Sequence, residues 1–125
     1  MITTTVLSRA AALTGIAATL VLAMSQANAH AELKSTTPKA DSTVSSPPMI
    51  EVHFDEAVEV KLSSLKLIAS DGAAISVMGM NDAKDPSTLS IMPNAKLAPG
   101  VYTAEWSVVS DDGHKETGTF KFTVQ

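Results

Sequence analysis

Turn-forming residues interrupt this chain at short intervals, and this spacing constrains the fold more than any other feature of the sequence. Between the turns lie short runs in which apolar and polar residues alternate, which is the period of a β-strand with one buried face. From Tyr102 to Val108, for example, every second residue is apolar. Short strands separated by turn signals every 8–12 residues or so are typical of an antiparallel sandwich.

We therefore predict an all-β fold, and specifically an Ig-like Greek-key β-sandwich of about seven strands. The predicted strands are Ala31–Ser35, Met49–Phe54, Ser64–Ala69, Ala74–Met80, Thr88–Met92, Val101–Ser110 and Thr117–Val124.

The first 29 residues have the three parts of a secretory signal. A positive charge at Arg9 precedes an apolar run over residues 10–23, and the small-x-small sequence Ala27-Asn28-Ala29 follows. The apolar run is shorter than the roughly 20 residues that span a bilayer, which favours cleavage over an uncleaved membrane anchor. We expect residues 1–29 to be removed as a signal peptide, and residues 30–125 to form one exported domain without stable membrane insertion.

Charge and cysteine content argue against several classes of function. The formal net charge is −4 and the sequence has no basic cluster, which disfavours nucleic acids and anionic lipid surfaces as partners. Because the chain has no cysteine, disulfides and thiolate metal sites are excluded. The sequence also lacks a set of Ser, His and Asp residues in a plausible base–nucleophile order, a phosphate-binding glycine loop and a cysteine nucleophile. We therefore expect a protein that is not an enzyme.

Cleavage after Ala29 would make His30 the first residue of the processed protein. A free N-terminal histidine offers two nitrogens, the α-amine and the imidazole Nδ1, which together close a chelate ring on a metal ion. Cu(II) stands at the top of the divalent affinity order and favours tetragonal nitrogen and oxygen donors. His30 is therefore the first candidate ligand of a single Cu(II) site.

The densest group of further donors is Asp111-Asp112-Gly113-His114, directly after a predicted strand. Asp-Gly marks a turn, and such a turn can present Asp112 and His114 to one point. With His30 they would supply three nitrogens and one oxygen, a set that suits Cu(II). Taken alone, the turn is better explained as a polar hairpin loop with a solvated histidine, and only the N-terminal histidine reverses that balance.

Residues 30–125 resemble the CopC family of periplasmic copper-binding proteins. The resemblance rests on His30 at the cleavage point, on the strand sequence Ile50-Glu51-Val52-His53-Phe54-Asp55-Glu56, and on two linked patterns, Tyr-x-x-x-Trp-x-x-x-Ser and Ser-x-Asp-x-His-x-x-x-Gly. These patterns are met here by Tyr102, Trp106, Ser110, Asp112, His114 and Gly118. The resemblance implies a Greek-key β-sandwich and a periplasmic location.

The resemblance also implies a Cu(II) site formed by His30, Asp112 and His114. Glu56 matches a further acidic position that some members place at or near the metal, so we expect either a weak donor or a surface carboxylate there. His53 is a further candidate ligand, but it shares a polar strand face with acidic residues. We expect it to be solvated or hydrogen-bonded to those carboxylates rather than bound to the metal.

Methionine is where this sequence departs from part of the family. Some members carry a methionine-rich loop with a histidine that forms a second site, for Cu(I), because thioethers suit a soft ion. The extended loop and its histidine are missing here, which makes a Cu(I) site doubtful, and we expect Met49 to pack in the core. The remaining candidate Cu(I) ligands are Met78, Met80 and Met92.

The predicted function is a periplasmic protein that sequesters Cu(II) and carries or buffers it for copper tolerance or uptake. The resemblance suggests an inner-membrane copper permease of the CopD type as a recipient, although the direction of transfer stays open. Two alternatives remain. One is a copper-dependent oxidative enzyme that uses the N-terminal histidine chelate, and the other is a metal-free Ig-like interaction module.

Overall fold

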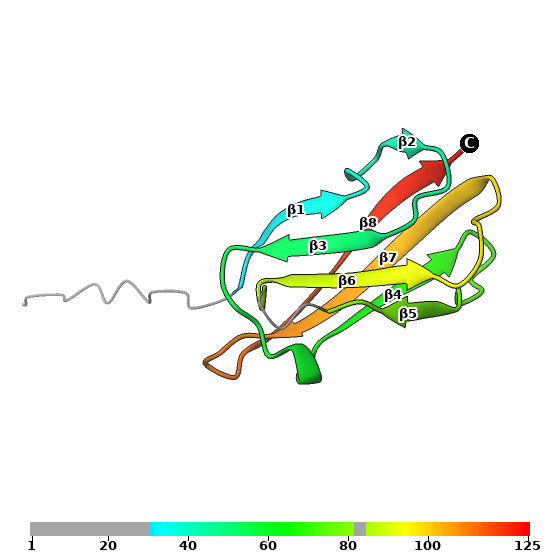
Figure 1. Ribbon diagram of the computed structural model, residues 1–125. Helices are drawn as coiled ribbons and strands as arrows, with labels where there is room; N and C mark the ends of the chain where they lie inside the picture. Colours follow the sequence, from blue (N-terminus) through cyan, green and yellow to red (C-terminus); the bar gives the residue numbers. More distant parts are fainter. Residues whose placement is uncertain (1–30, 82–84) are drawn as a thin grey trace, which may run out of the picture.

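Strands make up nearly all the regular structure in residues 31–81 and 85–125, which the computed structural model describes (Figure 1). Eight strands and one short 3-10 helix follow one another along these residues. They are β1 (Leu33–Thr37), β2 (Thr43–Val44), β3 (Ile50–Phe54), η1 (Val60–Leu62), β4 (Ser64–Ala69), β5 (Val77–Gly79), β6 (Thr88–Pro93), β7 (Gly100–Val109) and β8 (Lys115–Val124). No helix within these two ranges has the length and apolar character needed to cross a membrane.

The strands form two four-stranded sheets that pack face to face (Figure 1). One sheet has the order β1-β3-β6-β5 and the other the order β2-β8-β7-β4. Neighbouring strands are antiparallel, apart from the short β2, which runs parallel to β8. Strands β3 and β6 pair in one sheet, and the strands that follow them, β4 and β7, pair in the other. This is the Greek-key arrangement of Ig domains, so the predicted fold class is confirmed.

The core lies between the sheets because every second residue of each central strand points inward. In β3, Ile50 and Val52 are fully buried, whereas Glu51 and His53 are partly exposed. The alternation predicted for the last two strands is confirmed as well. Their buried inward-facing side chains are Tyr102, Ala104, Trp106, Val108, Phe120, Phe122 and Val124.

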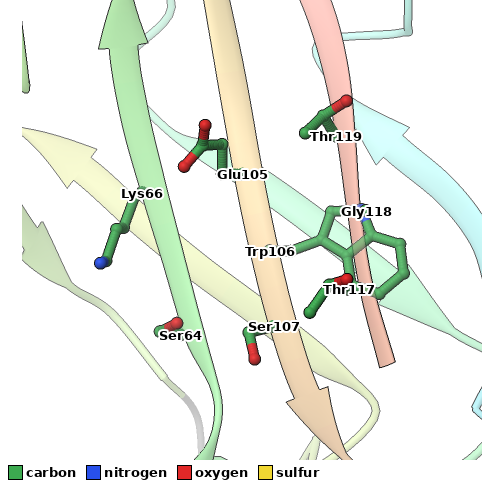
Figure 2. Close-up of a pocket in the computed structure, with 8 residues that line it drawn as sticks. All are labelled: Ser64, Lys66, Glu105, Trp106, Ser107, Thr117, Gly118 and Thr119. Atoms are coloured by element: carbon green, nitrogen blue, oxygen red, sulfur yellow. The ribbon is translucent and has the colours of Figure 1, made fainter. Parts of the chain in front are cut away.

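The Trp106 ring and Gly118 are fitted closely to each other (Figure 2). The two residues are directly opposite in the β7–β8 pair, and the ring also meets Phe54 edge-on, with centroids 5.2 Å apart. A Cβ atom on Gly118 would lie 2.6 Å from Cε2 of Trp106 and closer still to Cζ2. A side chain at position 118 would therefore displace the ring. The ring and this glycine also line a hollow of about 270 Å³ with polar residues of β4, β7 and β8.

Several strand boundaries differ from those predicted. Strand β1 begins at Leu33 instead of Ala31, and β5 covers only Val77–Gly79 because Ala74 forms just an isolated bridge with Ile68. The elements β2 and η1 are not predicted at all, since two or three residues carry no periodicity to detect. These differences leave the two-sheet arrangement unchanged.

One end of the sandwich gathers the segments that carry the predicted site (Figure 1). Strand β1 begins there, β3 ends there, and β7 turns into β8 there. Two pairings join these segments: Leu33 lies opposite Phe54 between β1 and β3, and Val58 forms a bridge with Ser110. The fold thus brings the turn after β7 beside the segment that follows β3.

Candidate metal centre

The turn between β7 and β8 is a tight loop closed by backbone hydrogen bonds. The Ser110 N–H donates to the His114 carbonyl at 2.9 Å, and the Gly113 N–H donates to the Ser110 carbonyl at 2.9 Å. Gly113 has a φ of 86°, a left-handed conformation that strongly favours glycine. The turn predicted from Asp-Gly is therefore present, and it holds Asp112 and His114 on one compact loop.

Asp112 and His114 form a direct pair at this turn. The imidazole Nδ1 lies 2.8 Å from Oδ2 of Asp112. An Nδ1–H donating to the carboxylate leaves the lone pair of the neutral ring on Nε2, and a carboxylate that orients an imidazole in this way is a common arrangement beside metals. Both side chains are partly exposed, at 61% for His114 and 32% for Asp112, so a solvated ion can reach them.

A hydrogen bond from the buried Ser110 fixes the Asp112 carboxylate. This serine is only 1% exposed, and its hydroxyl donates to Oδ1 of Asp112, which also accepts the His114 N–H at 3.2 Å. The Ser110 hydrogen bond, followed by the bond from the His114 side chain, lowers the pKa of Asp112 from 3.8 to about 2. Asp112 is therefore a carboxylate across the whole physiological range.

The start of the described chain is fixed to the segment that follows β3. The Glu32 N–H donates to Oδ1 of Asp55 at 2.7 Å, and the Asp55 N–H donates to the Glu32 carbonyl at 3.0 Å. Ala31 is fully buried in the core. The predicted ligand His30 and the predicted signal peptide, residues 1–29, lie outside the described residues.

Glu56 lies between two anchored positions. Asp55 before it contacts Glu32, and Val58 after it forms a bridge with Ser110. The Glu59 N–H also donates to the Val109 carbonyl at 2.7 Å, which fixes this segment against the end of β7. The Glu56 side chain is exposed. The fold therefore places its backbone between the β7–β8 turn and the first described residues.

The structure brings part of the predicted ligand set together. Asp112 and His114 are paired, and Glu56 is on a segment joined to the same turn. Within residues 31–81 and 85–125, no three His, Asp or Glu side chains are grouped closely enough to hold a metal ion. Sequence reasoning named Ser110 and Asp55 only as parts of family patterns and did not predict that they hold Asp112 and Glu32 in place. The Ser-x-Asp-x-His spacing signals the first, and nothing local signals the second.

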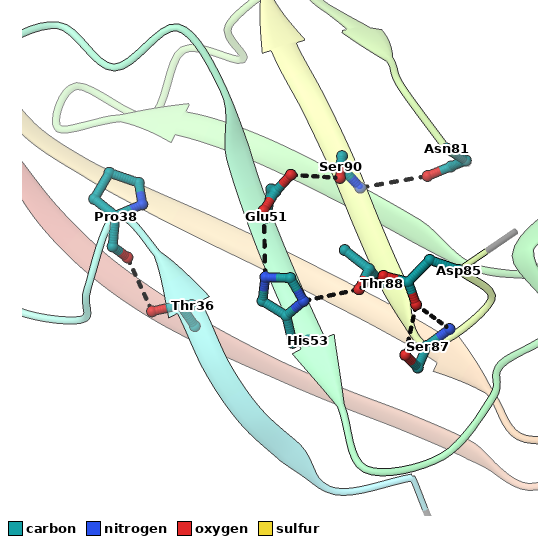
Figure 3. A network of polar contacts seen from close by, with 9 residues as sticks. All are labelled: Thr36, Pro38, Glu51, His53, Asn81, Asp85, Ser87, Thr88 and Ser90. Atoms are coloured by element: carbon teal, nitrogen blue, oxygen red, sulfur yellow. Dashed lines mark hydrogen bonds and ion pairs between the residues drawn. The ribbon is translucent and has the colours of Figure 1, made fainter.

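His53 lies on the outer face of β3 (Figure 3). Its Nε2 atom is 3.2 Å from Oε2 of Glu51, and its Nδ1 atom is 2.8 Å from Oγ1 of Thr88 on β6. The expectation that His53 shares a polar face with a carboxylate is thus confirmed for Glu51. Asp55, the other acidic neighbour in the sequence, instead accepts the Glu32 N–H.

The predicted Cu(I) candidates are not grouped as a trio. Met78 on β5 lies opposite Met92 on β6, whereas Met80 lines a hollow together with Met49 and His53. The expectation that Met49 packs in the core is wrong. It stands two residues before Glu51 on the same strand face, so alternation turns its side chain outward.

Comparison with known proteins agrees with the fold. The family model of the CopC domain matches residues 33–125. Copper resistance protein C of Escherichia coli is 37% identical over 106 residues, which cover 79% of this chain and 84% of that protein. Copper resistance protein C of Pseudomonas syringae pv. tomato is 36% identical over 111 residues, which cover 84% of this chain and 88% of that protein.

Solved structures give the same result. The crystal structure of PcoC, a methionine-rich copper resistance protein from Escherichia coli, superposes with a TM-score of 0.70 at 37% sequence identity, covering 77% of this chain and 99% of that one. The fold and the turn define a small Ig-like sandwich with a carboxylate–imidazole pair at one end. More narrowly, the chain belongs to the CopC family.

Proposed function

We propose that this protein binds one Cu(II) ion at the end of the sandwich formed by the β7–β8 turn, and that it carries or buffers this ion. The proposal rests mainly on the Asp112–His114 pair, a carboxylate and an imidazole held 2.8 Å apart on a tight loop. It is supported by membership of a family whose relatives in two bacteria are named for copper resistance.

The proposed ligands are the α-amine and imidazole of His30, the Asp112 carboxylate and the His114 imidazole. Oδ1 of Asp112 is occupied by the Ser110 hydroxyl and the His114 N–H, so Oδ2 is the oxygen that would pass from the imidazole to the metal. His30 stands two residues before Glu32, which is fixed to Asp55. That anchor favours an N-terminus close to this end of the sandwich.

Glu56 is proposed as a weak axial or outer donor. Its position between Asp55 and Val58 directs it to the same end of the sandwich, and its exposed side chain can turn toward a metal at low cost. A carboxylate there would also offset the charge of a divalent ion. These arguments favour a supporting contribution over a dominant one.

The proposed setting is the periplasm, after removal of residues 1–29. The protein would contribute to copper tolerance or uptake. Its partner, which receives or donates the ion, would be an inner-membrane copper permease of the CopD type. An Asp112 ligand favours carriage over catalysis, since it occupies a coordination position that an oxidative copper enzyme must keep open for its reaction.

The experiment is a Cu(II) competition titration on two forms of the protein, one beginning at His30 and one with a methionine left before it. The extra residue turns the α-amine into an amide and removes one ligand. We expect affinity to fall by at least about tenfold, or 1.4 kcal/mol. Equal affinities would overturn the N-terminal chelate, and a processed protein without tight copper binding would favour the metal-free interaction module.

A further inference from the structure

The pairing of β1 with β3 continues one residue beyond Leu33 and Phe54, but a side chain supplies one of its hydrogen bonds. Leu33 lies opposite Phe54, so the next pair in register is Glu32 with Asp55. In a regular antiparallel ladder, such a pair exchanges two backbone hydrogen bonds. The Asp55 N–H does donate to the Glu32 carbonyl at 3.0 Å, whereas the Glu32 N–H donates to Oδ1 of the Asp55 side chain at 2.7 Å. The carboxylate therefore takes the place of a backbone carbonyl where β3 ends.

Two features hold the first described residues in place. Ala31 is fully buried, and Asp55 engages both the N–H and the carbonyl of Glu32. His30 is bonded directly to Ala31, and consecutive Cα atoms are about 3.8 Å apart. Whatever fixes Ala31 and Glu32 therefore limits where the two nitrogens of His30 can lie.

Asp55 is also connected, through the backbone that follows it, to the turn that carries the other proposed ligands. Val58 forms a bridge with Ser110, and the Glu59 N–H donates to the Val109 carbonyl at 2.7 Å. One short segment therefore contacts the amino-terminal residues through its first side chain and the end of β7 through its later backbone. Asp55 is the point at which the two halves of the proposed ligand set are joined.

We propose that Asp55 is a positioning residue of the Cu(II) site. Its carboxylate orders the residues after His30, so that the α-amine and imidazole lie beside the β7–β8 turn in the metal-free protein. This inference rests on the proposed function, because it concerns the same site. Ligands that are already in place lose less conformational freedom on binding, and removing an outer residue that orients a ligand typically costs about 10–100-fold in metal affinity. The role differs from that of Glu56, which is proposed to offer its own oxygen to the ion.

The first arm of the test needs no copper and uses the protein that begins at His30. Asp55→Ala removes the acceptor of the Glu32 N–H, whereas Asp55→Asn keeps an amide oxygen that can accept. By NMR, we expect the Glu32 amide hydrogen to exchange with solvent at least about tenfold faster in Asp55→Ala than in the parent protein, and within about threefold of the parent rate in Asp55→Asn. Equal rates in Asp55→Ala and the parent protein would overturn the positioning role.

The second arm measures Cu(II) affinity by competition in the parent protein and in Asp55→Ala, each beginning at His30 or carrying a methionine before it. We expect Asp55→Ala to weaken binding at least about tenfold in the form that begins at His30. In the extended form the amine ligand is already lost, so the same substitution should cost less than about threefold. Equal losses in both forms would show that Asp55 does not act through the N-terminal chelate, and would overturn the inference.

Asp55→Asn separates positioning from direct ligation. It keeps the hydrogen bond to Glu32 but removes the negative charge, so Cu(II) affinity should stay within about threefold of the parent value. A loss as large as that in Asp55→Ala would identify Asp55 as a charged ligand and would refute the positioning role.

Asp71→Ala is the matched control. Asp71 is likewise an exposed aspartate whose Oδ1 accepts a backbone N–H, that of Ala73, at 2.9 Å. It follows β4, whose last residue Ala69 pairs with Tyr102 near the start of β7, so it lies at the opposite end of the sandwich from the β7–β8 turn. We expect Asp71→Ala to leave Cu(II) affinity unchanged. A loss as large as that in Asp55→Ala would mean that general destabilisation is the cause, contrary to the inference.

Failure of the proposed function would give a different pattern. If the two parent forms bind Cu(II) equally well, the N-terminal chelate is wrong, and the role of Asp55 at the site falls with it. If the parent forms differ and Asp55→Ala changes neither of them, the chelate stands and only the role of Asp55 is overturned.

Discussion

The Ser110 hydroxyl donates a hydrogen bond to the Asp112 carboxylate within the β7–β8 turn. The His114 backbone connects the same two residues, because its carbonyl accepts from the Ser110 hydroxyl and its N–H donates to the Asp112 carboxylate. Ser110 is buried while Asp112 reaches solvent, so the serine positions a carboxylate that faces outward. A hydrogen bond to the charged form stabilises that form. Ser110 therefore sets both the direction and the ionisation of the proposed oxygen ligand.

Replacing Ser110 with alanine should raise the pKa of Asp112 from about 2 toward its ordinary value of 3.8. A lowered pKa in the folded state stabilises the protein above the unfolded value and stops doing so as pH falls through the folded value. The stability lost in Ser110→Ala should thus be fully present above about pH 4 and shrink between pH 4 and 2. Carboxyl NMR titration and acid unfolding measure the two effects.

Ser107→Ala is the matched control, because it removes a hydroxyl from strand β7, which ends just before Ser110, without changing the turn. An Asp112 that titrates identically in Ser110→Ala and the parent protein would contradict the positioning argument.

The loss of Cu(II) affinity caused by a single substitution should be largest for residues at the proposed Cu(II) site and smaller for residues farther from it. His114→Ala and Asp112→Ala should each weaken Cu(II) binding by at least about tenfold, or 1.4 kcal/mol, and Glu56→Gln by less. His53→Ala should have little effect, since His53 contacts Glu51 and Thr88 on the sheet face instead. Competition titration gives the affinities, and electron paramagnetic resonance should lose nitrogen couplings in His114→Ala. A larger loss in His53→Ala than in His114→Ala would refute the assignment.

Sequence patterns predict this fold well because each long strand carries the signal of its own buried face. The apolar alternation of β7 and β8 is enough to identify their inward residues, and Asp-Gly identifies the turn between them. The pairing of Asp112 with His114 also follows from local spacing, since both lie on one tight loop.

Contacts between distant segments are what the sequence does not reveal. Thr88 stands 35 positions after His53, and Asp55 stands 23 positions after Glu32, so only strand register brings each pair together. The hollow shared by Met80 and His53 has the same origin. Local patterns identify which residues can bind a metal, whereas the sheet decides which of them meet.

Gly118→Ala should destabilise the fold because its new Cβ would lie 2.6 Å from Cε2 of Trp106. Overpacking of this kind costs about 1–3 kcal/mol in the free energy of unfolding. Gly79→Ala is the control, since a Cβ there meets nothing within 4 Å. Urea unfolding followed by tryptophan fluorescence measures both variants. Equal stabilities would mean that the ring moves aside freely, contrary to its packing against Phe54.

Trp106 should report Cu(II) binding directly. It stands four residues before Ser110 on β7, which is about 13 Å of strand, and the turn folds back from there. Paramagnetic Cu(II) quenches indole emission at short range, so fluorescence should fall to an endpoint at one equivalent of Cu(II), with much less effect from Zn(II). The form extended before His30 should need more metal to reach that endpoint. Quenching that rises linearly without a break, or that continues past two equivalents, would instead indicate loose binding to the acidic surface and would remove the main support for a dedicated Cu(II) site.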